Sequence, residues 1–199
     1  MEQKKSLALF DFDKTITDRD SFLPFMLFAF GILWTIWIFL VFLPQALICF
    51  AGLMSRKKFK EKIFRHTIKG WTKEKFHDIA LDFYQKKMRN WVRKSAADEI
   101  RRHLENGADV SLVSASPEDW LWPFTEEFGI NLIATRLEVK DGVYTGNIVG
   151  NNCRKAEKVR RVREVYNVEN YSDIYAYGDS SGDYEMLKMA DHPHFRYFN

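Results

Sequence analysis

The sequence predicts an α/β protein, a doubly wound parallel sheet interrupted by a helical insertion over residues 20–93. Apolar runs over 6–12, 109–114 and 173–177 have the length of buried strands, and helical patterns separate them. Strands that alternate with helices are typical of parallel, right-handed βαβ units. Between the first two runs, helical segments follow one another without a strand. A chain of 199 residues is long enough for one sizeable core with such an insertion.

The remaining elements follow from periodicity and end signals. Within the insertion, basic helices are predicted over 56–69 and 72–93, with Gly70 as a stop and Thr72 as an N-cap. Acidic residues in the first turn and Gly107 after the last turn mark a helix that begins at Ser95. The later elements are a helix over 117–128, a strand over 131–134, a hairpin around Asp141-Gly142 over 136–149, a basic helix over 154–166 and a helix near 182–190.

A long uncharged stretch lies inside the insertion. No charged residue occurs between Asp20 and Arg56, and Phe, Leu, Ile and Trp dominate this stretch. The run is predicted to be helical, with interruptions near Gly31 and Pro44. It lacks the polar stripe of a soluble helix, so it is buried all round or faces lipid. It begins too late and follows acidic residues, which excludes a secretory signal peptide.

The charge is unevenly distributed. Residues 56–103 carry 16 Lys and Arg against 6 Asp and Glu, whereas the rest of the chain is acidic on balance. On charge alone this segment fits a membrane or a nucleic acid. The adjoining apolar run favours a membrane, and no nucleic-acid-binding motif is present. Cys49 and Cys153 match no disulfide or metal-site spacing.

Two carboxylates, Asp11 and Asp13, follow the first predicted strand. In an extended chain, residues two apart point the same way, so both side chains would emerge together at the carboxyl end of this strand. Ligands of open α/β sheets bind at that edge. Two close carboxylates repel each other, and a bound cation relieves the repulsion. Mg²⁺ suits carboxylates, phosphate and water as ligands.

The other two predicted strands end in polar residues at the same edge. Ser114 ends one strand, and Ala115 can offer its backbone N–H there. Asp179 follows the other strand, with Asp183 one helical turn later. Lys158 lies in the first turns of the basic helix between them. Such a set of groups forms a site for a metal ion and a phosphoryl group.

Four short motifs occur in a fixed order: DFDKT at 11–15, LVSAS at 112–116, CRKAEK at 153–158 and GDSSGD at 178–183. With them the chain resembles the aspartate-nucleophile phosphatases of the haloacid dehalogenase superfamily. Within that superfamily it resembles subfamily IB, whose helical C1 cap lies between the first two motifs. The resemblance implies a Rossmann-like catalytic core over 1–19 and 94–199, and a cap over 20–93 that is all-helical and partly membrane-associated through the apolar segment 22–54.

The resemblance also assigns roles. Asp11 would be the nucleophile that forms an aspartyl-phosphate, and Asp13 the general acid and base. Mg²⁺ would be bound by Asp11, the backbone carbonyl of Asp13, and Asp179. Ser114, Ala115 and Lys158 would bind the phosphoryl oxygens. Asp183 would orient the metal ligands, and Thr15 would fix the loop after the strand.

Some residues depart from the family pattern or have a simpler explanation. Lys14 and Lys155 stand where many relatives have glycine, and Lys155 is a weaker rival to Lys158 for the phosphoryl group. Ser116, before Pro117, is interpreted as a helix N-cap. His192-Pro193-His194 is interpreted as a solvated turn. The six tryptophans are assigned to packing or to a membrane interface.

The catalytic motifs constrain how the apolar segment meets a membrane. Asp11 precedes this segment and the other motifs follow it, so both of its ends lie on one side, which excludes a single span. Two spans need about 40 residues, and the uncharged stretch holds 35. A re-entrant hairpin or a helix in the membrane plane is expected. The following basic tract, RKKFKEK, would lie at the cytoplasmic face of the inner or plasma membrane.

These expectations favour a Mg²⁺-dependent phosphomonoesterase that acts on a lipid phosphate. The hydrophobic cap resembles that of the phosphatidylglycerophosphatase C enzymes, which implies phosphatidylglycerophosphate as substrate. Two alternatives stay open. One is a phosphoserine-phosphatase-like hydrolase of a small soluble phosphomonoester, whose apolar segment forms a dimer interface. The other is a membrane-bound scaffold on an inactive phosphatase fold, which the complete set of catalytic positions disfavours.

Overall fold

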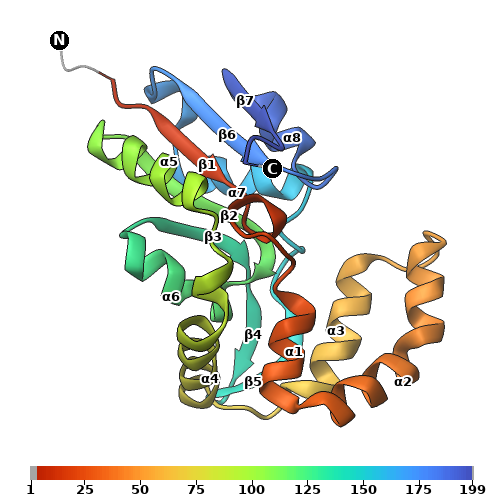
Figure 1. Cartoon of the computed structure of the whole chain (residues 1–199). Coiled ribbons are helices and arrows are strands. Elements are labelled where there is room, and N and C mark those ends of the chain that lie inside the picture. The colour runs from red at the N-terminus through yellow and green to blue at the C-terminus, as the bar shows by residue number, and fades with distance from the viewer. Residues whose placement is uncertain (1–3, 199) are drawn as a thin grey trace.

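A computed structural model describes residues 4–198, and its core is a five-stranded sheet (Figure 1). The strand order is β3-β2-β1-β6-β7, and every neighbouring pair is parallel. This confirms the predicted parallel α/β sheet. The strands are β1 (Leu7–Phe10), β2 (Asp109–Pro117), β3 (Asn131–Thr135), β6 (Ile174–Gly178) and β7 (His192–Phe195).

Helices cover both faces of the sheet, as a doubly wound fold requires. Successive side chains of β1 alternate between the faces and are fully buried on each. Ala8 and Phe10 pack with α5 (Lys94–Glu105) and α6 (Glu118–Phe128). On the other face, Leu7 and Leu9 pack with the remaining pair, α7 (Ala156–Val165) and α8 (Tyr184–Met189).

Between β1 and α5 the chain forms a helical cap region at one end of the molecule (Figure 1). Its helices are α1 (Phe22–Phe30), α2 (Ile32–Phe50), α3 (Arg56–Thr67) and α4 (Lys73–Lys86), followed by a 3₁₀ turn over Met88–Trp91.

The cap region is not built from helices alone. A hairpin from the second half of the chain, β4 (Leu137–Lys140) and β5 (Val143–Ile148), packs against α3. The backbone N–H of Gly70 donates to the carbonyl of Tyr144 at 2.8 Å. The sequence predicted this hairpin but not its position, because the contact joins segments more than 70 residues apart.

The predicted helix boundaries within the cap hold only in part. The helix breaks at Gly31, where φ is 77°, and the Thr72 side chain caps α4 by accepting from the N–H of Lys75. The predicted interruption near Pro44 is wrong, since α2 continues through it. Two residues earlier, Phe42 packs with Ile63 of α3, so tertiary packing holds the helix despite the lost backbone hydrogen bond.

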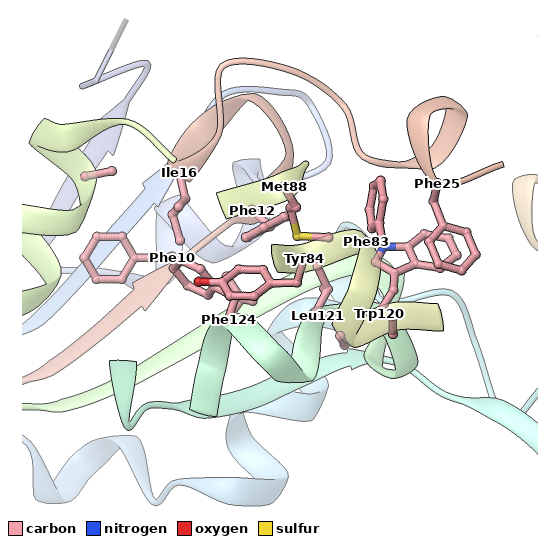
Figure 2. Packing of buried hydrophobic residues seen from close by; sticks show 14 of the residues in the cluster. Phe10, Phe12, Ile16, Phe25, Phe83, Tyr84, Met88, Trp120, Leu121 and Phe124 are labelled. Atoms are coloured by element: carbon pink, nitrogen blue, oxygen red, sulfur yellow. The ribbon is translucent and has the colours of Figure 1, made fainter. Parts of the chain in front are cut away.

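A single buried aromatic cluster joins the sheet to the cap region (Figure 2). Phe12, just after β1, meets Phe124 of α6 with 5.2 Å between ring centroids. Trp120, also on α6, stacks on Phe25 of α1 at 4.5 Å. Phe25 in turn contacts Phe83 of α4 at 5.3 Å. Helices α1 and α4 are therefore held to the core by buried ring contacts.

The interpretation of His192-Pro193-His194 as a solvated turn is wrong. These residues form β7, the edge strand beside β6. The His192 ring stacks on Tyr175 at 4.4 Å, and the His194 ring stacks on Tyr177 at 4.6 Å. A proline is tolerated on an edge strand because one side of that strand needs no hydrogen bond. Cross-strand stacking thus ordered a segment whose composition suggested a turn.

Candidate active site

The chain turns sharply where β1 ends. Residues Phe12–Ile16 form a tight helical turn, and Lys14 adopts a left-handed conformation with φ of 64°. The strand itself ends at Phe10, so the expected alternation does not run regularly from Asp11 to Asp13, although the backbone at Asp13 is extended with φ of −66° and ψ of 120°. Both carboxylates nevertheless line one pocket at the carboxyl edge of the sheet. The hydroxyl of Thr15 donates to Asp11 Oδ2 at 3.3 Å, which ties the turn to the end of the strand.

Lys158, at the start of α7, lies at the centre of the site. Its buried Nζ contacts Asp11 Oδ1 at 2.6 Å, Asp183 Oδ1 at 2.7 Å and the carbonyl of Val113 at 2.6 Å. Burial lowers the pKa of Lys158, but the charges of Asp11 and Asp183 outweigh burial, so its pKa is raised and the ammonium stays charged. Burial raises the pKa of Asp11 to about 7 against the opposing charge of Lys158. A cation beside Asp11 would lower that pKa.

Three carboxylates form a compact acidic cluster. Oxygens of Asp11, Asp179 and Asp183 lie within 4.8 Å of one another. Asp183 is held in place by the backbone N–H of Ser180 at 3.0 Å and by the Ser180 hydroxyl at 2.9 Å. A set of hard carboxylate oxygens at this spacing fits a divalent cation. The cluster contains Asp183 rather than the side chain of Asp13.

Ser116 does not cap a helix as predicted. No side-chain cap bond is present at the start of α6, and Pro117 takes the N-cap position. Instead the Ser116 hydroxyl donates to Asp13 Oδ2 at 2.6 Å, while the backbone N–H of Ser21 donates to Asp13 Oδ1 at 2.7 Å. Burial and the charge of Asp20 raise the pKa of Asp13 despite these bonds. The carboxyl of Asp13 is thus held between Ser116 of the core and Ser21 of the cap region.

The serine motif contributes to the same pocket. Ser114 and Ala115 line it, and the Ser114 hydroxyl accepts from the N–H of Ser116 at 3.1 Å. The carbonyl of Ala115 accepts from Lys60 Nζ of α3 at 2.9 Å and from the Thr135 hydroxyl at 2.8 Å. Lys60 therefore reaches from the cap region to the loop expected to hold the phosphoryl group.

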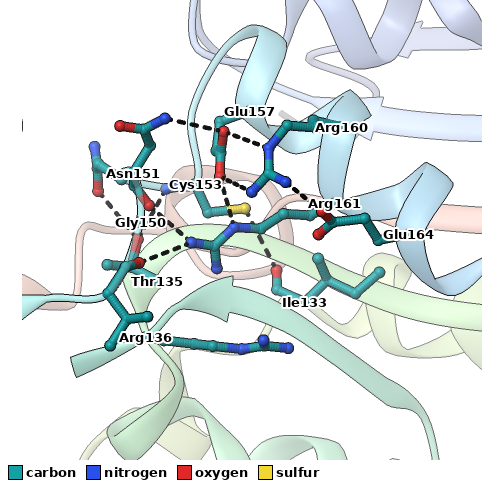
Figure 3. A network of polar contacts seen from close by, with 12 residues as sticks. Ile133, Thr135, Arg136, Gly150, Asn151, Cys153, Glu157, Arg160, Arg161 and Glu164 are labelled. Atoms are coloured by element: carbon teal, nitrogen blue, oxygen red, sulfur yellow. Dashed lines mark hydrogen bonds and ion pairs between the residues drawn. The ribbon is translucent and has the colours of Figure 1, made fainter. Parts of the chain in front are cut away.

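A polar network fixes the loop that leads to Lys158 (Figure 3). Glu157 accepts from Arg161 Nε at 3.0 Å, and Arg161 Nη2 donates to the carbonyl of Asn151 at 2.8 Å. Cys153 is tied to the end of β3, because its N–H donates to the Thr135 hydroxyl at 3.0 Å. The network gives buried Arg161 a carboxylate and several carbonyls, as a buried charge requires. The network therefore fixes the backbone of the segment that carries Lys158.

The pocket has a volume of about 600 Å³ and lies between the sheet edge and the cap region. One wall holds Asp11, Asp13, Asp179 and Asp183. The cap region contributes cations, apolar side chains and one further carboxylate: Asp20, Phe22, Ala46, Cys49, Phe50, Arg56, Phe59, Lys60 and Ile63.

All the site residues expected from the sequence lie in or beside this pocket. The sequence interpretation missed Ser21, Arg56 and Lys60, and it assigned Ser116 to another role. Arg154 was expected at the site as part of the basic start of the helix that carries Lys158. Ser116 lies inside the serine motif, and this position was a signal for its role. No sequence signal marked Lys60 among the many lysines of α3, since only the folding of the cap over the sheet edge selects it.

The comparisons with known proteins agree with this geometry. Residues 8–188 match the family described as haloacid dehalogenase-like hydrolase. Protein CicA of Caulobacter vibrioides is 36% identical over all of this chain and 89% of its own length. A protein of Mycobacterium tuberculosis named "Probable phosphatase" is 31% identical over 94% of this chain and 67% of its own length.

A solved structure of phosphoserine phosphatase, as a phospho-aspartyl intermediate analogue, superimposes with a TM-score of 0.65. It is 22% identical and covers 94% of this chain and 84% of its own, so it shows likeness of fold. The family match extends over most of the chain, and the first relative exceeds 30% identity over nearly its whole length. The chain therefore belongs to the haloacid dehalogenase-like hydrolases and is a phosphatase of the phosphoserine-phosphatase-like group.

Proposed function

We propose that this chain is a Mg²⁺-dependent phosphomonoesterase that works through a phosphorylated Asp11. The observation that carries the proposal is the convergence of Asp11, Asp13, Ser114, Lys158 and Asp179 on one pocket from segments spread over nearly the whole chain. A structural ion pair would explain Lys158 with Asp11 and Asp183. It would not explain why a second acid, Asp13, and the hydroxyl of Ser114 face the same pocket.

In the first half-reaction, a carboxylate oxygen of Asp11 attacks the phosphorus atom. The new bond joins this oxygen to phosphorus, and the bond between phosphorus and the substrate alcohol oxygen breaks. The proton of Asp13 passes to the departing alkoxide. The raised pKa of Asp13 favours the protonated form that this step needs. The ammonium of Lys158 and the hydroxyl of Ser114 stabilise charge on the phosphoryl oxygens.

In the second half-reaction, Asp13 takes a proton from a water molecule, which attacks the same phosphorus atom. The bond to Asp11 breaks, inorganic phosphate leaves, and Asp13 ends protonated as it began. Asp11, Asp179 and Asp183 would hold a magnesium ion, with the Asp13 carbonyl as a further candidate ligand. The ion would supply positive charge that offsets the charge of the phosphoryl group.

The comparisons favour a small soluble phosphomonoester as substrate. A phosphoserine phosphatase of Methanocaldococcus jannaschii is 25% identical over 96% of this chain and 84% of its own length. A histidinol-phosphatase of Neisseria meningitidis is 28% identical over 95% of this chain and 89% of its own length. Both names describe phosphomonoesters of small polar alcohols. A hydrolase of this type is the primary proposal.

Phosphate release from a panel of phosphomonoesters with Mg²⁺ tests this proposal. Asp11→Asn should abolish turnover, and the wild-type protein quenched in acid should carry an acyl-phosphate on the peptide that contains Asp11, cleavable by hydroxylamine. Asp109→Asn, a carboxylate at the opposite end of the sheet, is the matched control and should keep full activity. Turnover by Asp11→Asn, or phosphate on another residue, would refute the nucleophile assignment.

A second candidate substrate is a lipid phosphate, with phosphatidylglycerophosphate first, because of one feature of α2. This helix has 19 residues with a mean hydropathy of 2.2, and only 17% of its most apolar window is buried. Its carboxyl end contributes Ala46, Cys49 and Phe50 to the pocket wall. An exposed apolar helix that ends at the substrate pocket suits a substrate drawn from a bilayer.

The proposed membrane contact is a helix lying in the interface rather than a span. One side of α2 packs on Ile63 of the charged helix α3, and the basic residues that begin α3 follow its carboxyl end. This arrangement combines an apolar face with a basic patch, the two signals that stable attachment needs. The cytoplasmic face of the inner or plasma membrane is the proposed location.

Flotation with anionic phospholipid vesicles tests this candidate. Four leucines of α2, exposed by 54 to 81%, can be replaced by glutamine without touching buried packing: Leu33, Leu40, Leu43 and Leu47. The wild-type protein should float with vesicles and cleave lipid phosphate, and the variant should lose both while retaining hydrolysis of p-nitrophenyl phosphate. Equal flotation of the two proteins would remove the lipid candidate and leave the soluble phosphomonoester.

A further inference from the structure

Three cations that line the pocket have no carboxylate partner. Arg56 and Lys60 come from α3, and Arg154 comes from the loop before α7. Within residues 4–198, no carboxylate oxygen lies within 4.0 Å of their side-chain nitrogens, although many other lysines and arginines of the chain have such a partner.

Lys60 has an unusual environment for an ammonium group. Its Nζ donates to the carbonyl of Ala115 at 2.9 Å and to Asn152 Oδ1 at 3.3 Å, both neutral acceptors. Burial lowers the pKa of Lys60 to about 8, although the more distant charges of Asp13 and Asp20 oppose this. A desolvated cation without an ionic partner is costly, and an anion that enters the pocket would relieve the cost.

Arg154 and Arg56 add to the positive charge. Arg154 Nη2 donates to the Ser181 hydroxyl at 3.0 Å, which turns the guanidinium toward the GDSSGD loop. Burial and the like charge of Arg56 lower the pKa of Arg154, and Arg56 has the same effect on Lys60. Arg56 repels both of the other cations, and such a concentration of positive charge around one pocket forms a site for an anion.

The transferring phosphoryl group already has its own cation. Lys158 lies between Asp11 and Asp183, beside the nucleophilic oxygen. Arg56 and Lys60 project from the cap region, on the side where the alcohol portion of a substrate must lie once its phosphorus faces Asp11. Because Lys158 already serves the phosphoryl group, Arg56 and Lys60 are expected to bind a group on the alcohol portion of the substrate.

We propose that Arg56, Lys60 and Arg154 form a subsite for a second anionic group on the alcohol portion of the substrate, such as a carboxylate or a phosphodiester. The inference rests on the proposed phosphomonoesterase function and narrows its substrate class. A guanidinium binds either group with paired hydrogen bonds. The subsite adjoins Ala46 and Phe50, so a soluble acid and an anionic lipid headgroup are both accommodated.

Equilibrium binding to the Asp11→Asn protein in the presence of Mg²⁺ tests the subsite without turnover. O-phosphoserine and O-phosphoethanolamine share the phosphoryl group and the amine, and differ only in the carboxylate. Phosphatidylglycerophosphate and phosphatidic acid in detergent micelles form the lipid pair, of which only the first has a phosphodiester. In at least one pair the member with the second anion should bind about tenfold more tightly. The pair that shows the preference identifies the source of the anion.

Charge-removing variants in the same background locate the preference. Lys60→Gln and Arg154→Gln should bring the affinity ratio within the pair close to one and change binding of the member without the second anion by less than about threefold. Lys62→Gln removes an exposed charge from the same helix outside the pocket and should leave the ratio unchanged. Circular dichroism establishes that each variant is folded.

Two results would overturn the subsite. The first is equal affinity for both members of both pairs. The second is an equal loss for both members in Lys60→Gln and Arg154→Gln, which would assign these cations to the reacting phosphoryl group. Failure of the proposed phosphomonoesterase function would give a different result. The wild-type protein would then release no phosphate from any substrate, while the preference for the ligand with a second anion would persist.

Discussion

Replacing Ser116 with alanine removes one of the two hydrogen bonds that hold Asp13. The lost bond is a buried 2.6 Å contact to a carboxyl group, and the 2.7 Å bond from the Ser21 N–H remains. Asp13 becomes a carboxylate as its proton passes to the alkoxide, and a hydrogen bond to a charged group contributes about 1.5 to 3 kcal/mol. Because one bond persists, we expect a loss near the lower limit, and about 1.5 to 2 kcal/mol in the barrier corresponds to a rate lowered about 10- to 30-fold.

The assay compares two leaving groups. An alkyl phosphate such as phosphoserine needs a proton from Asp13 when its alkoxide departs, whereas p-nitrophenolate departs without one. Ser116→Ala should therefore slow the first half-reaction with the alkyl ester much more than with the p-nitrophenyl ester, measured as single-turnover phosphorylation of Asp11. Ser116→Thr keeps the hydroxyl and should restore the rate.

Ser111→Ala is the matched control. It deletes a hydroxyl from the same strand, but that hydroxyl bonds Tyr166 and not Asp13. Equal slowing of both leaving groups in Ser116→Ala would refute a role through the general acid and would indicate a general disturbance of the loop. An unchanged rate with the alkyl ester would refute the positioning of Asp13 by this hydroxyl.

Three further predictions concern charge, backbone and pH. Lys158→Met should abolish phosphate release and lower the free energy of unfolding without Mg²⁺ by about 3 to 5 kcal/mol, because it leaves two buried carboxylates unpaired; an unchanged urea midpoint would contradict this. Lys155 has φ of 56° and ψ of −131°, so Lys155→Gly should raise the free energy of unfolding by about 1 kcal/mol, and a lower midpoint would count against backbone strain there. Burial raises the pKa of Asp119 from 3.8 to about 6. In the unfolded chain this carboxyl loses its proton near pH 3.8, whereas in the folded protein it keeps the proton until the pH reaches about 6. The carboxyl therefore contributes its full stabilisation below pH 3.8, and this contribution is lost as the pH rises through 6. The melting temperature of the wild type should fall relative to Asp119→Asn over that range, and parallel profiles would refute the shift.

The sequence was sufficient for four of the five strands of the sheet and for the order of the motifs. The apolar runs that became β1, β2 and β6 carry no competing helical pattern, and three of the four motifs lie at the carboxyl ends of these strands. Gly31 and Thr72 were placed correctly because a left-handed turn and an N-cap depend on neighbouring residues alone.

The rest depended on contacts between distant segments. Ser116 was taken as a cap because Ser-Pro is a local helix signal, and the competing partner, Asp13, is 103 residues away. The strand β7 forms because tyrosine rings of β6 stack with its histidines, which overrides the turn propensity around Pro193. Lys60 could be distinguished from its neighbours only once α3 was packed against the pocket.

The rings that join Phe25 and Phe83 to Trp120 also determine how the protein opens. Lifting the whole cap away from the sheet would expose this aromatic surface to water, at about 25 cal/mol for each Å². Helix α2 buries only Thr35, Ile38 and Phe42, so it is attached far more weakly. Admission of substrate and escape of phosphate are therefore expected through displacement of α2 alone, while α1, α3 and α4 stay in place.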